Sequence, residues 1–303
     1  MSTPTAHEGL IPFRGYRVWY RIVGDRDEPG RAPLLCLHGG PGVPHDYIEP
    51  LQALAATGRR VVFYDQLGCG RSDQPRHDPA MWTVPLFVEE IGAVRAALGL
   101  SRVHLLGQSW GGMLALEYAL TQPAGLASLV LANTSASMPA WIAELDRLRA
   151  QLPADVKSTL QRHESAGTTD SAEYQQAMNV FYRRHACRID PYPEPVQRAF
   201  DQVAKNPQVY RTMWGPSEFH VTGTLKTWDR SDRLGEIRVP TLALCGRHDE
   251  ATPALLQALQ HGIDGCETAI FEHSSHMPHV EEPQRYLQVV GDFLQRVDRR
   301  AAG

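Results

Sequence analysis

The sequence predicts a single α/β domain, built on a mostly parallel, doubly wound sheet, into which a helical cap is inserted. Two patterns lead to this prediction. Short apolar runs alternate with amphipathic helical segments, and this alternation stops between residues 134 and 228 before it resumes. The length agrees, because 303 residues suit one large domain or one domain that carries an insertion.

Six short apolar runs are typical of strands that a parallel sheet buries on both faces. They cover residues 34–37, 61–64, 103–106, 129–132, 241–245 and 268–271. Ahead of them, residues 16–23 alternate in the manner of an antiparallel edge strand. Helices are predicted where apolar side chains recur at three- and four-residue steps, over residues 87–98, 113–120 and 286–297.

The segment that interrupts this alternation contains no buried-strand run. It is helical and charged, and prolines break it at positions 153, 191, 193 and 195. We therefore assign residues 1–133 and 229–303 to the core domain and residues 134–228 to the helical cap. An insertion at this point of the chain would emerge at the carboxyl ends of the strands and cover them.

Composition and charge exclude several classes of partner. The chain has 30 Lys and Arg against 34 Asp and Glu, a formal net charge of −4, and no basic run, so we expect no nucleic acid partner. No apolar stretch approaches the ~18 residues of a membrane span, so we expect no membrane partner. The first residues lack the layout of a secretory signal, and the five cysteines are scattered. We expect a cytoplasmic protein that is a monomer or a small homo-oligomer.

The sharpest chemical signal is the pattern G-Q-S-W-G at residues 107–111, between a predicted strand and a predicted helix that starts near Gly112. In this strand–turn–helix context, G-x-S-x-G is the signature of a nucleophilic serine. The sharp turn forces its central residue into a strained backbone conformation, and only glycine lets the neighbouring backbone approach closely enough. We therefore predict that Ser109 is the nucleophile.

A serine nucleophile needs two N–H groups that stabilise the oxyanion. The residue after the nucleophile, Trp110, is expected to supply one of them. The second should come from the glycine-rich loop at residues 38–42, which follows a buried strand. Since Pro41 has no N–H, Gly40 is the predicted donor.

The serine also needs a base, and a histidine base needs an acid that orients it. In the chain order Ser…Asp…His, Asp249 is the predicted acid because it stands just past the strand at residues 241–245. Three histidines, His273, His276 and His279, follow the last predicted strand. We favour His276 as the base because it lies a few residues ahead of the helix start that Pro283 marks. The alternative, a metal site formed by these histidines and Asp249, leaves the serine motif unexplained.

At this point the chain resembles a known family. HGGPG at residues 38–42, DQLGCGRSDQP at 65–75, GQSWGG at 107–112, YRTMWGPSEF at 210–219 and GRHDEATP at 246–253 are together similar to the proline iminopeptidases (prolyl aminopeptidases) of the α/β-hydrolase superfamily. The resemblance implies an α/β-hydrolase fold and a serine exopeptidase. Such an enzyme releases an N-terminal residue, preferentially proline, from a small peptide or aminoacyl amide through an acyl-enzyme. It implies neither a metal nor an organic cofactor.

The resemblance also implies a binding site for the substrate's free amino group. Glu218 and Glu250 match the acids that hold this group, Tyr210 matches a cap tyrosine that lines the site, and the Gly40–Pro41 bond is expected to be cis. The residues themselves point in the same direction. Glu250 adjoins the predicted acid of the triad, and Glu218 lies in an apolar setting where a carboxylate without a partner is costly.

Other functions stay open on the sequence alone. A broad amino-acid amidase or esterase, or a lactonase, would use the same triad. In a different class, a non-catalytic receptor could keep the hydrolase pocket to sense a small ligand, although an intact triad speaks against it. The readings of Glu250 as a helix cap and of Glu218 as a solvated residue also remain alternatives.

Overall fold

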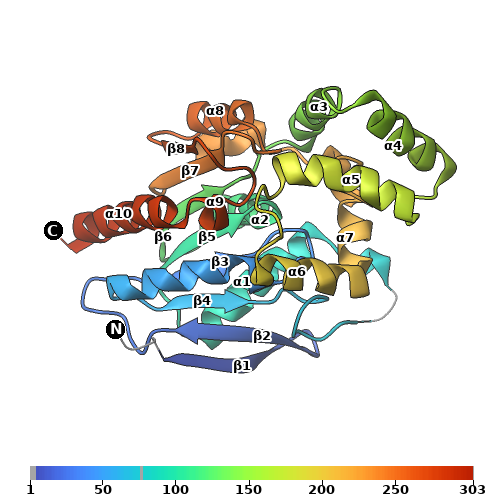
Figure 1. The fold of residues 1–303 in the computed structure, drawn as a ribbon. Helices are drawn as coiled ribbons and strands as arrows, with labels where there is room; N and C mark the ends of the chain where they lie inside the picture. The colour runs from blue at the N-terminus through green and yellow to red at the C-terminus, as the bar shows by residue number, and fades with distance from the viewer. Residues whose placement is uncertain (1–4, 76–77, 303) are drawn as a thin grey trace.

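The computed structural model of the chain describes residues 5–75 and 78–302. Its centre is an eight-stranded sheet in the order β1-β2-β4-β3-β5-β6-β7-β8 (Figure 1). The strands from β4 to β8 in this order run parallel to one another, whereas β2 is antiparallel to both of its neighbours, β1 and β4. All six predicted strands are confirmed, but the last of them, β8, is an edge strand that is only partly buried rather than covered on both faces. The bounds are β1 (Ala6–Phe13), β2 (Tyr16–Val23), β3 (Leu34–Leu37), β4 (Val61–Tyr64), β5 (Val103–Gln108), β6 (Leu126–Ala132), β7 (Thr241–Gly246) and β8 (Glu267–Phe271).

The prediction that residues 16–23 form the edge of the sheet is wrong. β1 pairs with β2 along its whole length and is itself the edge strand. Arg14 and Gly15 join the two strands, both with positive φ (49° and 83°), as a tight two-residue hairpin requires. The sequence analysis did not predict β1, because Ile11 and Phe13 are the only buried side chains of this strand and so it has little hydrophobic alternation.

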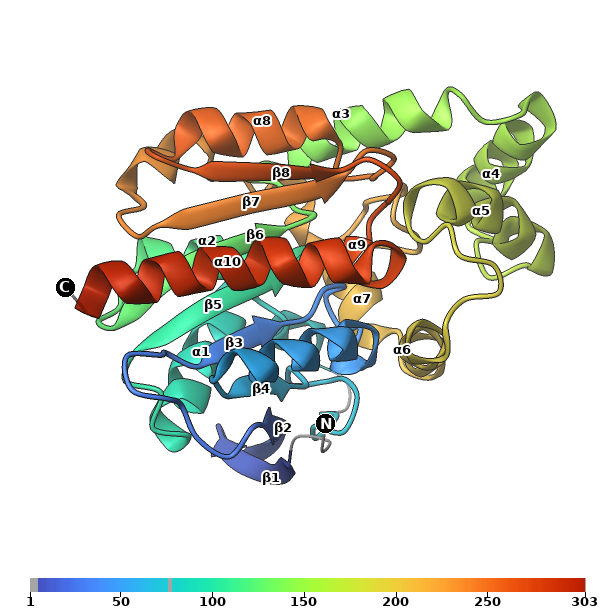
Figure 2. The same ribbon diagram turned by 60° about the vertical axis from the view of Figure 1, so that its left-hand side comes forward.

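Helices cover both faces of the sheet. Figure 2 shows α10 (Pro283–Ala302) and the 3₁₀ segment η1 (His45–Thr57) on one face, with α1 (Val84–Ala97) and α2 (Trp110–Leu120) on the other. α8 (Pro253–Gly262) packs against β7 and β8 at one end of the sheet. The three predicted helices are confirmed with longer bounds, and α10 begins at Pro283 as expected. The expected start of α2 near Gly112 is two residues late, because Trp110 is already helical.

The predicted cap lies between β6 and β7, beyond the carboxyl ends of the parallel strands (Figures 1 and 2). The two ends of this insertion meet where Ser137 pairs with Asp229, whose carboxylate accepts the Ser137 hydroxyl hydrogen at 2.7 Å. Pro153 and Pro193 immediately precede two of its helices. Its helices are α3 (Met138–Arg149), α4 (Ala154–Ala166), α5 (Ala172–His185), α6 (Glu194–Lys205), α7 (Gln208–Met213) and the 3₁₀ turn η3 (Thr224–Thr227).

Three further short elements complete the description. They are η2 (Pro79–Met81), which precedes α1, η4 (Ser231–Glu236), which precedes β7, and the one-turn helix α9 (Pro278–Glu281), which stands between β8 and α10. Across residues 5–75 and 78–302, none of the helices is both long enough and apolar enough to cross a membrane.

Candidate active site

Ser109 stands at the apex of a sharp turn between β5 and α2. Its φ of 58° and ψ of −123° are strained for a residue with a side chain. A Cβ atom on Gly107 would lie 2.0 Å from the Gly111 carbonyl oxygen, and one on Gly111 would lie 2.3 Å from the Leu37 carbonyl oxygen. Both flanking glycines are therefore required by close backbone approach, as the sequence argument predicts.

The glycine-rich loop after β3 packs directly against this serine. A Cβ atom on Gly39 would lie 2.9 Å from the Ser109 Cβ atom, and Gly40 has a φ of 109°. The Gly40–Pro41 peptide bond is cis, in agreement with the expectation from the resemblance. Trp110 is the first residue of α2, and N–H groups at this position have no partner within a helix. The backbone donors predicted at Gly40 and Trp110 thus belong to the two segments that flank Ser109.

Asp249 and His276 meet in the loops that follow β7 and β8. The His276 Nδ1 atom lies 2.7 Å from Asp249 Oδ1, which also accepts the Ala251 N–H at 2.8 Å. Burial lowers the pKa of His276, but the charge and hydrogen bond of Asp249 and the charge of Glu218 outweigh it, so that the net pKa is raised. With Nδ1 bonded to Asp249, the Nε2 atom is free to take a proton from a nucleophile.

The other two histidines of this loop have different surroundings. His273 is exposed. His279 is buried between the rings of Tyr47 and Tyr286, with Nε2 placed 3.0 Å from the Tyr47 carbonyl oxygen. Burial lowers the pKa of His279 to about 3, so this side chain stays neutral. Of the three, His276 alone contacts Asp249 in the described structure.

Asn133, which the sequence analysis did not single out, supports the acid. It directly follows β6 and has a φ of 54°, a conformation that asparagine tolerates better than most residues. Its Nδ2 atom lies 2.5 Å from Asp249 Oδ2. The sequence did contain a signal for this role, because Asn133 directly follows the buried strand β6. That strand is the neighbour of β7, and Asp249 follows β7.

The two glutamates predicted to hold an amine reach the same site from opposite sides. Glu250 follows the triad acid in the core, and its Oε1 atom lies 3.7 Å from His276 Nε2. It is 1% exposed, and neither carboxyl oxygen has a hydrogen-bond partner in the described residues. Glu218 comes from the cap, and the Tyr210 hydroxyl donates to its Oε1 atom at 2.6 Å. Among the described residues, the structure therefore holds a buried carboxyl group without a hydrogen-bond partner.

The two carboxyl groups influence one another. Burial raises the pKa of Glu250 far above its usual range, and the neighbouring charges of Glu218 and Asp249 raise it further. Burial also raises the pKa of Glu218, although the Tyr210 hydroxyl, the charge of His276 and the nearby carboxyl group of Glu250 act against this. Two acids so placed retain a proton between them when nothing positive is present. An ammonium group would remove the need for that proton.

One cavity connects the nucleophile with the acids. Its empty volume, which includes open solvent at the mouth, is about 370 Å³. Ser109 and His276 line it together with both glutamates, and its remaining lining is mainly apolar: Gly40, Val43, Tyr47, Gln108, Tyr182, Ala186, Phe200 and Met277. Trp110 and Asp249 are not among its lining residues, in keeping with roles through a backbone amide and behind the histidine.

The contribution of the cap tyrosines differs from the expectation. Tyr210 does not line the cavity and instead orients Glu218 from behind. Tyr182, which sequence reasoning missed, does line the cavity, and its hydroxyl oxygen accepts the Glu218 N–H at 3.2 Å. No motif distinguishes Tyr182 from the other aromatic residues of α5, so its role depends on the packing of the cap.

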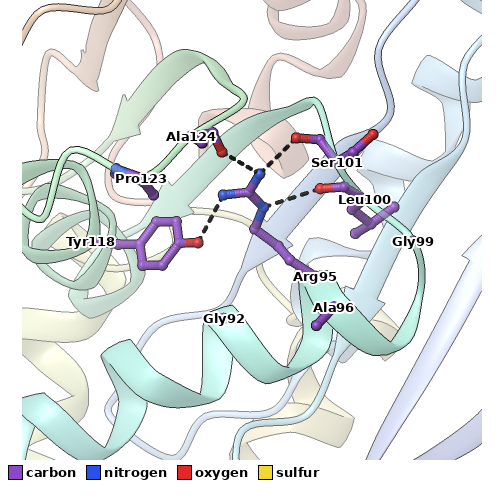
Figure 3. Close-up of a pocket in the computed structure, with 9 residues that line it drawn as sticks. All are labelled: Gly92, Arg95, Ala96, Gly99, Leu100, Ser101, Tyr118, Pro123 and Ala124. Carbon is purple, nitrogen blue, oxygen red and sulfur yellow. Dashed lines mark hydrogen bonds between the residues drawn. The ribbon is translucent and has the colours of Figure 1, made fainter.

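A second hollow lies between α1 and the loop that follows α2 (Figure 3). Arg95 occupies its centre and donates to Tyr118 and to the backbone oxygens of Leu100, Ser101 and Ala124. These bonds fix the ends of α1 and α2, so Arg95 has a structural use there. Within the described residues, no group of three or more His, Cys, Asp or Glu side chains is arranged to hold a metal ion.

The chain is similar to a known protein family and to curated relatives over most of its length. The family profile described as the alpha/beta hydrolase fold matches residues 32–283. A proline iminopeptidase of Heyndrickxia coagulans is 42% identical over 96% of this chain and 99% of its own length. One of Saccharolobus solfataricus is 40% identical over 96% of this chain and 93% of its own length.

Solved structures give the same picture. The proline iminopeptidase of Mycobacterium smegmatis has a TM-score of 0.91 at 44% identity, covering 97% of this chain and 100% of its own. The crystal structure of VinJ has a TM-score of 0.94 at 47% identity, covering 97% of this chain and 99% of its own. Est816, an N-acyl homoserine lactone degrading enzyme, has a TM-score of 0.68 at 21% identity, covering 94% of this chain and 100% of its own. That last similarity shows a shared fold alone.

Proposed function

The chain belongs to the proline iminopeptidase family of α/β-hydrolases, and from this premise we propose that it is a serine exopeptidase that releases an N-terminal residue, preferentially proline. The observation that best supports this function is the environment of the Glu250 carboxyl group. Its carboxyl group is buried without a hydrogen-bond partner in the described residues, in the cavity that Ser109 lines. A buried unpaired acid is costly, and the protonated N-terminus of a peptide is the partner that offsets this cost.

The proposed binding mode uses the two acids on either side of the cavity. Glu218 and Glu250 receive the substrate's ammonium group, and Tyr210 and Tyr182 keep Glu218 in place. The apolar part of the lining, which includes Val43 and Phe200, suits a pyrrolidine ring. Because the ammonium is fixed beside the nucleophile, the carbonyl of the first residue is the one that Ser109 can reach.

The proposed reaction has two halves. His276 Nε2 takes the proton of Ser109, whose oxygen forms a bond to the carbonyl carbon, while the amides of Gly40 and Trp110 stabilise the oxyanion. The carbon–nitrogen bond then breaks, and His276 gives its proton to the leaving amine. Water next attacks the acyl-enzyme, with His276 again as the base, which releases the free amino acid and restores Ser109. Asp249 stabilises the imidazolium throughout.

The cap, residues 134–228 in our assignment, would limit the site to unextended N-termini. Substrates would be small peptides or aminoacyl amides, because only a free ammonium satisfies the two acids. We also propose a cytoplasmic location, supported by five cysteines that are all buried and unpaired in the described structure.

A panel of naphthylamides tests the proposed activity. The prolyl, alanyl and N-acetylprolyl derivatives are offered to the wild type and to Ser109→Ala, each at several concentrations. We expect the highest kcat/KM with prolyl-naphthylamide, a lower value with the alanyl compound, and no cleavage of the N-acetylated one. Ser109→Ala should abolish all cleavage.

Each alternative function has its own result in this panel. Cleavage of N-acetylprolyl-naphthylamide at a rate similar to that of the free amine would overturn the exopeptidase and favour a broad amidase. Failure of a fluorophosphonate to label Ser109, together with no turnover of any substrate, would favour a non-catalytic receptor.

A further inference from the structure

Two buried side chains join the three segments that carry the candidate site. The Gly39 N–H donates to the Tyr47 hydroxyl oxygen at 2.7 Å, and the Tyr47 hydroxyl donates to Gln108 Oε1 at 2.5 Å. The Gln108 Nε2 atom in turn donates to the backbone carbonyl of His276 at 3.0 Å. The glycine-rich loop, the turn before Ser109 and the loop of the base are therefore connected by three consecutive hydrogen bonds.

The direction of every bond in this chain is determined. A backbone N–H can only donate, so the Tyr47 oxygen accepts from Gly39 and its own hydrogen must go to another acceptor. Burial raises the pKa of Tyr47 well above its usual range, so the hydroxyl keeps that hydrogen. Gln108 therefore presents Oε1 to Tyr47 and its amide nitrogen to the His276 carbonyl oxygen. Only one orientation of the Gln108 amide satisfies both contacts.

Packing holds the two side chains in this arrangement. Tyr47 and Gln108 are 2% and 1% exposed. A Cβ atom on Gly39 would lie 2.8 Å from the Tyr47 hydroxyl oxygen and 2.9 Å from Gln108 Oε1, so the loop is seated directly on this pair. On the other side, His279 Nε2 contacts the Tyr47 backbone carbonyl at 3.0 Å.

We propose that Tyr47 and Gln108 are positioning residues that keep the oxyanion loop and the base loop in register with Ser109. The inference rests on the proposed function. The Tyr47 hydroxyl anchors the Gly39 N–H at the start of the loop, and the Gly39 carbonyl accepts the Val43 N–H at 3.3 Å, so the Gly39–Gly40 peptide that carries the N–H of Gly40 is held from both sides. The His276 carbonyl fixes the backbone from which the imidazole extends. Neither Tyr47 nor Gln108 makes or breaks a bond in the reaction.

Tyr47→Phe removes the central hydroxyl and is the main test, with Tyr286→Phe as its matched control. Tyr286 is also fully buried and also contacts His279, but its hydroxyl has no hydrogen-bond partner in the described residues. Gln108→Met is the second variant, because it removes both amide contacts at nearly constant volume. The thermal midpoint of each variant shows whether it folds.

The readouts separate positioning from binding. Since a displacement of about 1 Å can cost on the order of 10²-fold in rate, we expect Tyr47→Phe and Gln108→Met to lower kcat on prolyl-naphthylamide by about that factor. KM and inhibition by free proline should change less than about twofold, because the ground-state contacts remain. A prolyl boronate, which resembles the tetrahedral intermediate, should bind more weakly in proportion to the loss of kcat. Tyr286→Phe should leave all four quantities unchanged.

Two results would overturn the proposal. One is an equal loss of kcat in Tyr47→Phe and Tyr286→Phe, which would indicate a general effect of core packing. The other is a rise in KM with kcat retained. The rate at which a fluorophosphonate labels Ser109 gives a further readout that needs no peptide substrate. If the wild type fails to cleave aminoacyl naphthylamides, slower labelling in both variants still supports positioning, and unchanged labelling contradicts it.

Discussion

The Oε1 atom of Glu250 lies 3.7 Å from the Nε2 atom of His276. The group that would bind the substrate's ammonium and the group that would act as the base are thus neighbours in one cavity. The charge of Glu218 also acts on His276 and raises its pKa. Binding of a positive charge between the acids and proton transfer at the histidine are consequently coupled through electrostatics.

This coupling predicts the acid side of the pH profile. The raised pKa of His276 means that the free enzyme protonates its base at a higher pH than an ordinary histidine, whose pKa is about 6.5. Since only neutral imidazole can accept the Ser109 proton, kcat/KM should fall with decreasing pH and reach half its maximum above about pH 6.5. A profile measured with prolyl-naphthylamide checks this.

Removing the nearby charge should move that midpoint. In Glu218→Gln the imidazolium of His276 loses a stabilising charge, so its pKa falls. The acid limb measured with a naphthyl ester that lacks an amine should therefore shift to lower pH. Glu89→Gln serves as the control, because Glu89 is an exposed residue of α1 whose carboxylate pairs with Arg14. It should leave the acid limb of the pH profile unchanged. An identical profile for the two variants would contradict the coupling.

Glu250→Gln tests the amine site itself. Removing one partner of a desolvated charge pair costs about 2–5 kcal/mol, which corresponds to at least ~30-fold in affinity. We expect a loss of kcat/KM of this size on prolyl-naphthylamide, and Glu218→Gln should behave in the same way. Turnover of an ester without an amine should stay near the wild-type value at a pH where His276 is neutral. Equal losses on both kinds of substrate would reject the role.

Asn133→Ala addresses the support of the triad acid. Hydrogen bonds to charged groups contribute about 1.5–3 kcal/mol, so loss of the Asn133 amide should lower kcat by roughly 10- to 100-fold. Within the described residues the Asn133 amide hydrogen-bonds to Asp249 alone, so KM should change little. Asn133→Asp should be worse, because it places a second carboxylate against Asp249. Retained activity in Asn133→Asp would show that the contact has no catalytic value.

Arg198 on α6 connects the cap to the core. Its Nε and Nη2 atoms lie 2.8 Å from Asp46 Oδ1 and 2.6 Å from Glu49 Oε2, and Gln202 adds a bond to Asp46 at 2.8 Å. The same helix carries Phe200 into the cavity. Because an ion pair of a half-exposed arginine is worth at most about 1 kcal/mol, Arg198→Ala should barely change overall stability. It should raise KM several-fold by loosening α6.

The matched control for the cap contact is Arg211→Ala. Arg211 pairs with Asp170 inside the cap and makes no ion pair to the core in the described residues. High salt should raise the wild-type KM toward that of Arg198→Ala, since screening weakens the same contacts. If both arginine variants raise KM equally, the connection to the core is not the cause.

Those parts of the fold that the sequence predicted correctly are governed by local physics. Runs such as residues 61–64 are apolar without alternation, and a chain segment of that kind is stable only when both faces are covered. The turn around Ser109 was equally predictable, because close backbone contacts at Gly107 and Gly111 permit no other residue. The edge strand β1 was missed because its exposure leaves almost no hydrophobic pattern.

What escaped prediction depends on contacts between distant segments. Asn133, Tyr182 and Tyr47 reach the site from β6, the cap and η1, and each acts on a residue that another element supplies. No spacing along the chain records such contacts. The same reason explains the error at Tyr210. The sequence placed it correctly beside Glu218, but it could not show that Tyr210 lies behind Glu218 and does not line the cavity.

Asp298 near the end of α10 is the centre of a buried charge cluster far from the cavity. Its carboxylate contacts His104 Nε2 at 3.0 Å, Arg59 at 3.1 Å and the Ala32 N–H at 3.3 Å, which ties α10 to β5 and to the segment before β3. Breaking a buried pair costs about 3–5 kcal/mol, because the remaining partner, here the buried Arg59, is left unpaired. Asp298→Asn should therefore lower the free energy of unfolding by about 3 kcal/mol.

The charge cluster around Asp298 also predicts how the free energy of unfolding changes with pH. Burial lowers the pKa of His104, and although burial alone would raise the pKa of Asp298, its contacts with His104 and Arg59 lower it. Both groups thus bind fewer protons when folded than when unfolded, so stability must fall as pH decreases from about 6.5 toward the ordinary aspartate value of about 3.9 and below. Urea unfolding should show a loss of stability below about pH 3.9 in the wild type that is smaller in Asp298→Asn. The loss between about pH 6.5 and about pH 3.9, which comes from His104, should remain in the variant because Asp298 raises the pKa of His104. Asp292→Asn, which alters an exposed residue of the same helix, should follow the wild type; parallel curves for all three proteins would exclude Asp298 as the source.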